Sequence, residues 1–180
     1  DLFNLFSKST GLLVLTLLNK ITIDEVNYSS ILDAILEKRY LIGAEEKNNN
    51  IKVSNVESWK FLLGHIAFEL ENDKPVTRIS LSDIINITSS ELKSEISHSG
   101  EKDFSNIISL ELIRGGYIFE KDGFYEFEIK AIQEYLCAYY ISEKVRYLVR
   151  SKKKKFLEEF QKLFFQKIYS PYVWKHITYI

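Results

Sequence analysis

Apolar side chains recur at helical spacing along most of this chain, and few residues interrupt them. Only two prolines and seven glycines occur among the 180 residues, and these are the residues that most often end a helix. Hydrophobic residues make up 46% of the chain, which is enough to form a core. One apolar stripe consists of Val56, Trp59, Leu62, Leu63, Ile66, Ala67 and Leu70. Its spacing predicts a helix that ends near Asn72, and the whole pattern favours a mainly α protein.

Similar stripes predict helices on either side of this one. The apolar run at residues 12–18 is far shorter than the roughly 20 residues that cross a bilayer, so it is predicted to be a buried helix and no membrane span is expected. A second helix is predicted from a cap at Ser29 or Ser30 to a stop at Gly43. Later helices are predicted from Ile132 onward and at residues 156–168. Ser170-Pro171 is predicted to cap and open another, with Trp174, Ile177 and Ile180 as its buried face.

Two sequences before the middle of the chain fit the capping box, in which a hydroxyl and an acid three residues later satisfy each other's backbone amides. They are Ser80-Leu81-Ser82-Asp83 and Thr88-Ser89-Ser90-Glu91. Ile87 and Leu92 flank the second box at the positions of a hydrophobic staple. Each box therefore predicts the start of a separate helix.

A β-hairpin is predicted after these helices. Its strands are residues 117–120 and 124–129, and Lys121-Asp122-Gly123 joins them with residues that accept the positive φ of a tight turn. A further helix, residues 104–113, precedes it and ends at Gly115-Gly116. Three helices and a hairpin in this order predict a winged helix. The predicted fold is a helical domain at 1–74, a winged-helix domain at 75–140, and the start of a C-terminal helical region at 141–180.

Charge is divided unevenly along the chain, although its net charge is only −1. Residues 141–180 carry a net charge of +7, and residues 1–140 carry −8. The basic residues include a run of Arg150, Lys152, Lys153, Lys154 and Lys155. This run could follow a phosphate backbone, but the absence of interleaved aromatic residues favours a solvated joint between two helices. DNA readout by the helix at 104–113 is disfavoured because acidic residues surround it.

No catalytic constellation is evident in these residues. The chain lacks a Walker-type loop and a Gly-x-Gly-x-x-Gly loop, so no backbone cradle for phosphates is expected. His65, His98 and His176 stand apart without a second ligand at metal spacing, and no metal site is predicted. The single cysteine, Cys137, allows no intrachain disulfide and is predicted to be a small buried residue, which favours a cytoplasmic protein.

The end of the hairpin and the start of the next helix carry a family resemblance. Residues 127–138 read Phe-Glu-Ile-Lys-Ala-Ile-Gln-Glu-Tyr-Leu-Cys-Ala. They resemble the Phe-x-His-x-Ser/Thr-x-Gln-Glu-Tyr-Leu-x-Ala signature that follows the winged helix in NACHT-type STAND NTPases, the NLR-like signalling ATPases. Residues 11–18, 62–70 and 112–118 resemble earlier helices and the hairpin entry of the family in the same order. The resemblance covers about residues 8–140.

The resemblance implies a regulatory role rather than catalysis within these residues. It implies a parent ATPase that binds ATP or ADP with Mg²⁺ in a nucleotide-binding domain upstream in the same chain, and a sensor domain downstream. The helical and winged-helix portion would close over nucleotide at rest, then swing and allow homo-oligomerisation after a trigger binds. Antiphage or innate immune defence is the implied role. The missing methionine and abrupt start also favour a piece of a longer protein.

The signature implies interdomain contacts at Phe127, Gln133, Glu134 and Tyr135. From helical geometry, Gln133 and Glu134 either contact an adjoining domain or are ordinary exposed polar residues. No phosphate sensor is expected, because Ile129 replaces the histidine of the family and cannot donate a hydrogen bond. Two other functions remain open: a winged-helix regulator that grips nucleic acid with residues 141–155, and a protein–protein interaction module of another large assembly.

Overall fold

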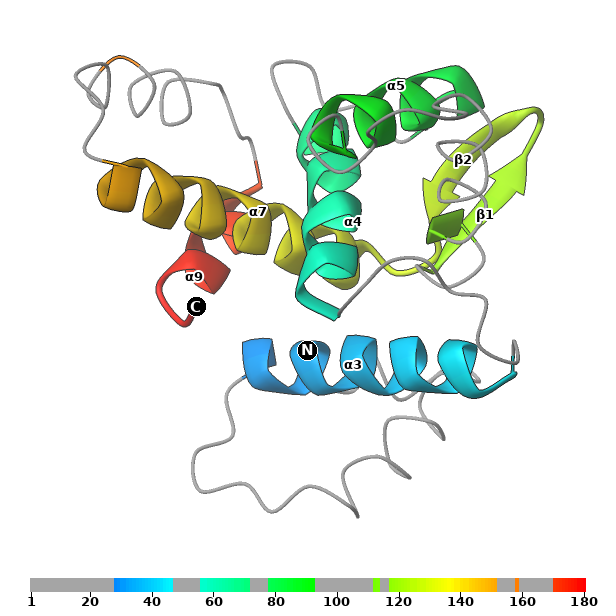
Figure 1. The fold of residues 1–180 in the computed structure, drawn as a ribbon. Helices are drawn as coiled ribbons and strands as arrows, with labels where there is room; N and C mark the ends of the chain where they lie inside the picture. The colour runs from blue at the N-terminus through cyan, green and yellow to red at the C-terminus, as the bar shows by residue number, and fades with distance from the viewer. Residues whose placement is uncertain are drawn as a thin grey trace.

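The computed structural model describes residues 28–46, 56–71, 78–92, 112–113, 117–151, 158 and 170–180. In these residues it contains the helices α3 (Tyr28–Glu46), α4 (Val56–Glu71), α5 (Leu81–Leu92), α7 (Lys130–Ser151) and α9 (Pro171–Ile177), and the strands β1 (Ile118–Lys121) and β2 (Phe124–Phe127) (Figure 1). The prediction of a mainly α fold with a β-hairpin is confirmed. The predicted helix at 12–18 lies outside the described residues, as do most of those at 104–113 and 156–168.

The two helices α4 and α7 form the centre of the fold, where they cross and pack against each other (Figure 1). Leu63 and Ile66 of α4 and Leu136 of α7 are fully buried. The helices approach closely at Gly64, where a Cβ atom would lie 2.7 Å from the Leu136 carbonyl oxygen and 2.9 Å from Tyr140 Cβ. Only glycine leaves room for this approach, so Gly64 sets the spacing of the central helix pair.

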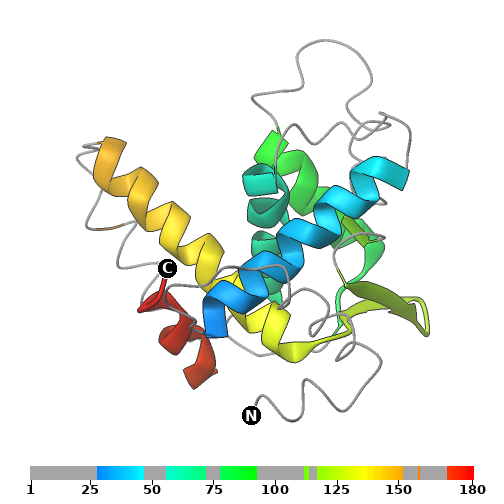
Figure 2. The ribbon, with the colours of Figure 1, turned by 90° about the horizontal axis from the view of Figure 1, so that it is seen from below.

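Three other helices attach to this pair. Helix α3 lies across one side of α4 and α7, as Figures 1 and 2 both show, and buries Leu32 and Leu36 completely. Helix α5 packs on α4 through Ile84, and α9 packs on α7 through Val173. The buried apolar residues form one cluster with members from all three of the predicted regions. Among the described residues, no helix combines the length and the hydropathy needed to cross a membrane.

The hairpin follows its prediction closely. Strands β1 and β2 are antiparallel, with Ile118 opposite Phe127 and Lys121 opposite Phe124. Asp122 and Gly123 form the turn with φ of 55° and 78°, which is the left-handed conformation that favours Asp-Gly in two-residue hairpins. Ile79 adds a bridge to the other side of β2 through two backbone hydrogen bonds with Tyr125, of 2.9 and 2.8 Å. This bridge was not predicted.

The first predicted capping box marks the start of α5 correctly, although its Asp83 carboxylate accepts a hydrogen bond from the Ser80 hydroxyl; the second predicted box is wrong. The Ser80 hydroxyl accepts a hydrogen bond from the Asp83 amide at 3.2 Å, as expected at the start of α5. Thr88-Ser89-Ser90-Glu91, by contrast, lies inside α5. There the hydroxyls of Thr88 and Ser89 donate to the carbonyls of Ile84 and Ile85, both at 2.8 Å. A hydroxyl that donates to a carbonyl of the preceding helical turn does not cap a new helix. The helix therefore continues through these residues, and Ile87 does not act as a hydrophobic staple.

Two further helix predictions need correction. Helix α3 does not stop at Gly43 but continues to Glu46, because one glycine costs a helix only about 1 kcal/mol and does not end it by itself. In α9, the most buried residues are Val173 and His176. The predicted face of Trp174, Ile177 and Ile180 is only partly buried and lies beside them. The apolar spacing did not predict this face because one of its two buried residues is the polar His176, which contacts Ser29 and Tyr135.

The close approach at Gly64 predicts an unusual response to a Gly64→Ala substitution. In a helix facing solvent, this change stabilises by about 0.5–1 kcal/mol. Here we expect it to destabilise the chain by about 1–3 kcal/mol, because the new methyl group meets the backbone of α7. Urea unfolding of the two proteins measures the difference. An unchanged or higher free energy of unfolding would show that α4 and α7 do not meet at this glycine.

Candidate functional site at the Gln-Glu-Tyr junction

Three consecutive residues near the start of α7 each contact a different part of the protein. Gln133, Glu134 and Tyr135 are all buried, with 4%, 9% and 3% of their surfaces exposed. Successive side chains on a helix point about 100° apart, so the three reach in different directions. We call these residues and their partners Glu71, Ser170 and Asp33 the Gln-Glu-Tyr junction.

Gln133 connects α7 to the end of α4. Its side-chain amide donates a hydrogen bond of 2.7 Å to Oε1 of Glu71, the last residue of α4. The Lys130 ammonium forms a salt bridge with the same oxygen from the more exposed side. Glu71 is almost completely buried, and a buried carboxylate is tolerated only when it is paired and hydrogen-bonded. The first turn of α7 supplies both the charge and the hydrogen bond.

Glu134 connects α7 to the start of α9. Its Oε1 accepts a hydrogen bond of 2.6 Å from the Ser170 hydroxyl. Ser170 is at the N-cap position of α9, as predicted, but its side chain makes no capping hydrogen bond. Burial raises the pKa of Glu134, and the nearby charge of Glu71 adds to this effect, while the Ser170 hydrogen bond and Lys130 oppose it. The hydroxyl that could cap α9 therefore holds α9 on α7 instead.

Tyr135 connects α7 to a salt bridge between α3 and α4. Its hydroxyl donates a hydrogen bond of 2.6 Å to Oδ1 of Asp33. The same oxygen lies 2.8 Å from Nζ of Lys60, whose side chain is only 5% exposed. Burial raises the pKa of Tyr135 far above its ordinary value, and the charge of Asp33 raises it further. The phenol therefore remains a hydrogen-bond donor, and one carboxylate joins three helices.

Lys60 has further partners around it. Its ammonium lies 3.4 Å from Oε1 of Glu37 on α3 and 5.1 Å from the centre of the Tyr139 ring on α7. A buried ammonium requires such partners, because removing it from water is costly. Asp33, Lys60 and Glu71 were not predicted as site residues, and Ser170 was predicted only as a helix cap. A signal for Asp33 and Glu37 was their spacing of four residues, which places two carboxylates on one face of α3.

The residues before α7 complete the signature segment. Phe127 is buried in the core, and Ile129 is partly buried against it. The Ile129 carbonyl accepts the amides of Ile132 and Gln133 at 3.1 and 3.2 Å, which forms the first turn of α7. Its apolar side chain offers no hydrogen bond to a ligand. Ile129, which stands where the resembled signature has a histidine, therefore contributes packing and backbone hydrogen bonds.

The other residues considered from the sequence are the basic run and Cys137. Arg150 is exposed near the end of α7, and Lys152, Lys153, Lys154 and Lys155 lie outside the described residues. Cys137 is fully buried, as predicted, and burial raises the pKa of its thiol well above the ordinary value, so a thiolate nucleophile is disfavoured. The described ranges contain no group of three His, Cys, Asp or Glu side chains that could hold a metal ion.

Two histidines have opposite environments. His65 on α4 lies between the carboxylates of Glu69 and Glu91. Burial by itself lowers its pKa, but the contacts with these two acids raise it above 6.5. His176 on α9 is buried with Nδ1 2.7 Å from the Ser29 hydroxyl oxygen and its ring edge-on to Tyr135. Burial, together with the charge of Lys175, lowers the pKa of His176 to about 4.

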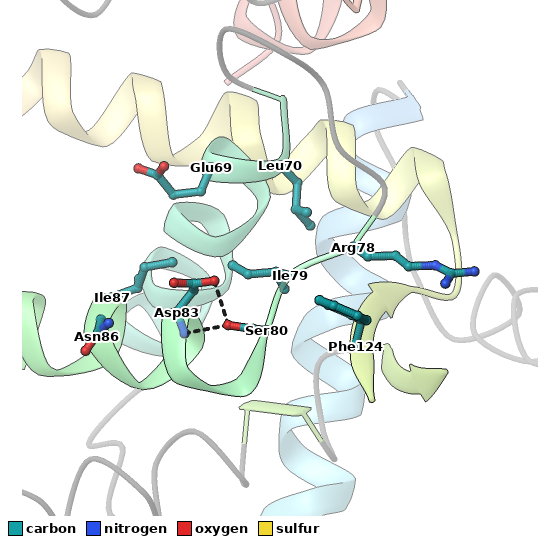
Figure 3. A pocket seen from close by; sticks show the side chains of 9 residues that line it. All are labelled: Glu69, Leu70, Arg78, Ile79, Ser80, Asp83, Asn86, Ile87 and Phe124. Carbon is teal, nitrogen blue, oxygen red and sulfur yellow. Dashed lines mark hydrogen bonds between the residues drawn. The ribbon is translucent and has the colours of Figure 1, made fainter. Parts of the chain in front are cut away.

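A cavity of about 350 Å³ lies where the end of α4, the start of α5 and the hairpin meet (Figure 3). Leu70, Ile79 and Ile87 provide apolar lining, and the remaining lining residues are Glu69, Arg78, Ser80, Asp83, Asn86 and Phe124. Figure 3 shows the Arg78 side chain extending away from Asp83, and its guanidinium lies near Asp122 and Glu126. The carboxylate of Asp83 accepts a hydrogen bond of 2.6 Å from the Ser80 hydroxyl. The same Ser80 hydroxyl caps α5, and the lining residues include no histidine or cysteine.

Comparisons of the chain with protein-family models, with curated proteins and with solved structures find no match. The structure brings Gln133, Glu134 and Tyr135 into contact with three different segments, at the positions of the sequence signature. These contacts hold the described helices together.

The Tyr135 contact predicts a selective loss of stability. Replacing Tyr135 with Phe removes one buried hydrogen bond to a charged group, and we expect a loss of roughly 1–2 kcal/mol. Tyr125→Phe is the matched control, because the Tyr125 hydroxyl makes only a long, exposed contact of 3.4 Å with Glu120. Denaturant unfolding compares the two variants. Equal effects of the two substitutions would contradict the role of Tyr135 in the junction.

The lowered pKa of His176 predicts a loss of stability in mild acid. A histidine with a folded pKa of about 4 and an ordinary pKa of 6.5 contributes stability above pH 6.5 that is lost as the pH falls toward 4. We expect the free energy of unfolding to decline between pH 6.5 and 4.5, and to decline less in His176→Gln. Urea unfolding at half-unit pH steps tests this. Parallel pH profiles for the two proteins would exclude His176 as the cause.

Proposed function

We propose that these residues form the regulatory helical and winged-helix portion of a NACHT/STAND-like signalling NTPase. In this proposal the portion acts as a nucleotide-linked conformational switch that controls oligomerisation. The observation that supports it best is the Gln-Glu-Tyr junction, in which three adjacent side chains of the signature hold α4, α9 and α3 on α7. A portion that swings as one body needs such connections, because its helices must keep their relative positions while a separate interface changes.

The order of the elements supports the winged-helix part of the proposal. Two helices were predicted at residues 80–92, but α5 is one continuous helix. In this proposal α4 therefore becomes the first helix of the winged helix, and the winged helix begins at Val56 rather than at residue 75. The Ile79 bridge, α5, the helical residues Leu112 and Ile113, and the hairpin then follow in sequence. Ile79 and the hairpin together form three paired segments, and α4 and α5, which pack on each other, line one cavity together with Phe124 of β2. This is the arrangement expected of a winged helix whose last helix leads into the hairpin.

In this proposal, ATP or ADP with Mg²⁺ binds in a nucleotide-binding domain upstream in the same chain. Ile129 offers no hydrogen bond, so the described residues would respond to nucleotide through contact between domains rather than through a phosphate sensor at this position. Partners would be that domain, further copies of the protein after activation, and a downstream sensor domain. A cytoplasmic protein with a role in antiphage or innate immune defence fits this picture.

The proposal is tested in the longer protein that contains these residues. Gln133→Leu removes the hydrogen bond to buried Glu71 and loosens α4 from α7. We expect the oligomeric state of the variant to differ less between ADP and ATP than that of the wild type, because helices that no longer keep their relative positions cannot swing as one body. Size-exclusion chromatography with light scattering, in ADP and in ATP, measures the oligomeric state.

Glu128→Gln is the control for this experiment, because Glu128 is exposed and lies just before the same helix. It should oligomerise as the wild type does. An oligomeric state that is the same in ADP and ATP for all three proteins would overturn the proposed switch. Absence of a Walker loop from the upstream sequence would overturn the assignment to an NTPase.

A further inference from the structure

A second polar cluster, separate from the Gln-Glu-Tyr junction, joins α4, α5 and α7. We call its members, His65, Glu69, Glu91, Tyr140 and Lys144, the His65 cluster. Nδ1 of His65 lies 2.8 Å from Oε1 of Glu91, and Nε2 lies 3.5 Å from Oε1 of Glu69. The Nδ1 contact is not aligned as a hydrogen bond, and it is an ion pair when the imidazole is protonated. The imidazole therefore lies between two carboxylates.

Helix α7 forms the other side of the cluster. Nζ of Lys144 lies 3.1 Å from Oε1 of Glu91, and the Tyr140 hydroxyl donates to the same oxygen at 3.3 Å. The Tyr140 ring stacks on His65 with a centroid distance of 4.7 Å and an interplanar angle of 15°. Lys144 also lies 5.0 Å from the centre of the Phe61 ring. Glu91 of α5 is thus held by one group from α4 and two from α7.

The charges of the cluster balance in only one protonation state of His65. With His65 protonated, two cations face two carboxylates. With His65 neutral, Lys144 alone faces Glu69 and Glu91, and the cluster carries one uncompensated negative charge. The side chains of His65 and Glu91 are only 16% and 19% exposed, so water screens this charge incompletely. The neutral state therefore weakens the hold of α4 and α7 on Glu91.

We propose that the His65 cluster is a protonation-dependent clamp that fixes the C-terminal end of α5 onto α4 and α7. Glu91 is one residue from the last residue of α5, while the other end of this helix is held by the Ser80 cap and the Ile79 bridge. The clamp closes when His65 is protonated and loosens when it is neutral. This inference does not depend on the proposed function.

The pKa values of the two central groups agree with the geometry. Burial raises the pKa of Glu91, but its contacts with His65 and Lys144 lower it to about 2. The pKa of His65 is above its ordinary value of 6.5. A histidine whose pKa is raised on folding contributes stability that is complete below 6.5 and is lost as the pH rises through the folded value. Glu91 loses its contribution only below about 4.5, so the clamp opens on the alkaline side.

Amide hydrogen exchange in the full 180-residue chain tests the clamp. Protection factors, which are corrected for the intrinsic pH dependence of exchange, are compared at pH 6.0 and 9.0. We expect protection of the last turn of α5 to fall roughly two- to fivefold at pH 9.0, the range that corresponds to a partly exposed ion pair. Protection in the middle of α4 should change less. Equal protection of α5 at both pH values would overturn the proposal.

Two variants separate His65 from other causes. In His65→Gln, protection of α5 should be the same at both pH values and close to that of the wild type at pH 9.0. In His176→Gln, the matched control, the wild-type pH dependence should remain, because His176 titrates near pH 4 and contacts α3 and α7 rather than α5. A pH dependence that persists in His65→Gln would overturn the clamp.

A measurement on the wild type keeps the test decisive even if His65→Gln does not fold. The imidazole proton resonances of His65, assigned by NMR, give its pKa in the folded chain. We expect a value above 6.5, together with a shift of the Tyr140 ring resonances over the same pH range, because the two rings are stacked. A His65 pKa at or below 6.5 would show that the carboxylates do not bind a protonated imidazole.

Discussion

The close contact of α4 and α7 at Gly64 is the constraint on which the rest of the described structure depends. Because glycine has no Cβ, the backbone of α7 comes within van der Waals distance of α4 at Leu136 and Tyr140. This spacing allows the Tyr140 ring of α7 to stack on His65 of α4. It also allows the Lys60 ammonium of α4 to lie over the Tyr139 ring of α7. Every other described helix is attached to this pair through side chains that the pair positions.

The attachments are polar as well as apolar, and they differ in what they respond to. The Gln-Glu-Tyr junction uses hydrogen bonds from an amide and two hydroxyls to carboxylates, and the strength of such bonds depends on correct alignment. The His65 cluster uses opposite charges, so its strength depends on protonation. Helix α9 is thus held by a hydrogen bond, α3 by a hydrogen bond and the ion pairs of Lys60, and the end of α5 by ion pairs that include a histidine. A protein whose parts move relative to one another can use both kinds of connection independently.

Much of the fold could be predicted from sequence because its signals are local. The spacing of apolar residues in α4 reflects burial of one helix face, and Asp122-Gly123 accepts the backbone of a hairpin turn by itself. The predictions were wrong where one local sequence is compatible with two structures. The hydroxyl of Thr88 can cap a helix or bond one turn back, and only the surroundings decide between them. The burial of His176 on α9 could not be predicted from the spacing of apolar residues, because histidine is polar.

For the candidate site, the sequence alone identified Gln133, Glu134 and Tyr135 as a unit but left open whether they contact other segments or face solvent. Burial of all three was decided by tertiary structure, because their partners Glu71, Ser170 and Asp33 are between 36 and 102 residues away in the chain. The sequence determined which elements form, since helical spacing and turn residues act within a few positions. Tertiary structure decided which polar groups meet, since a carboxylate and its donor are brought together only when helices pack.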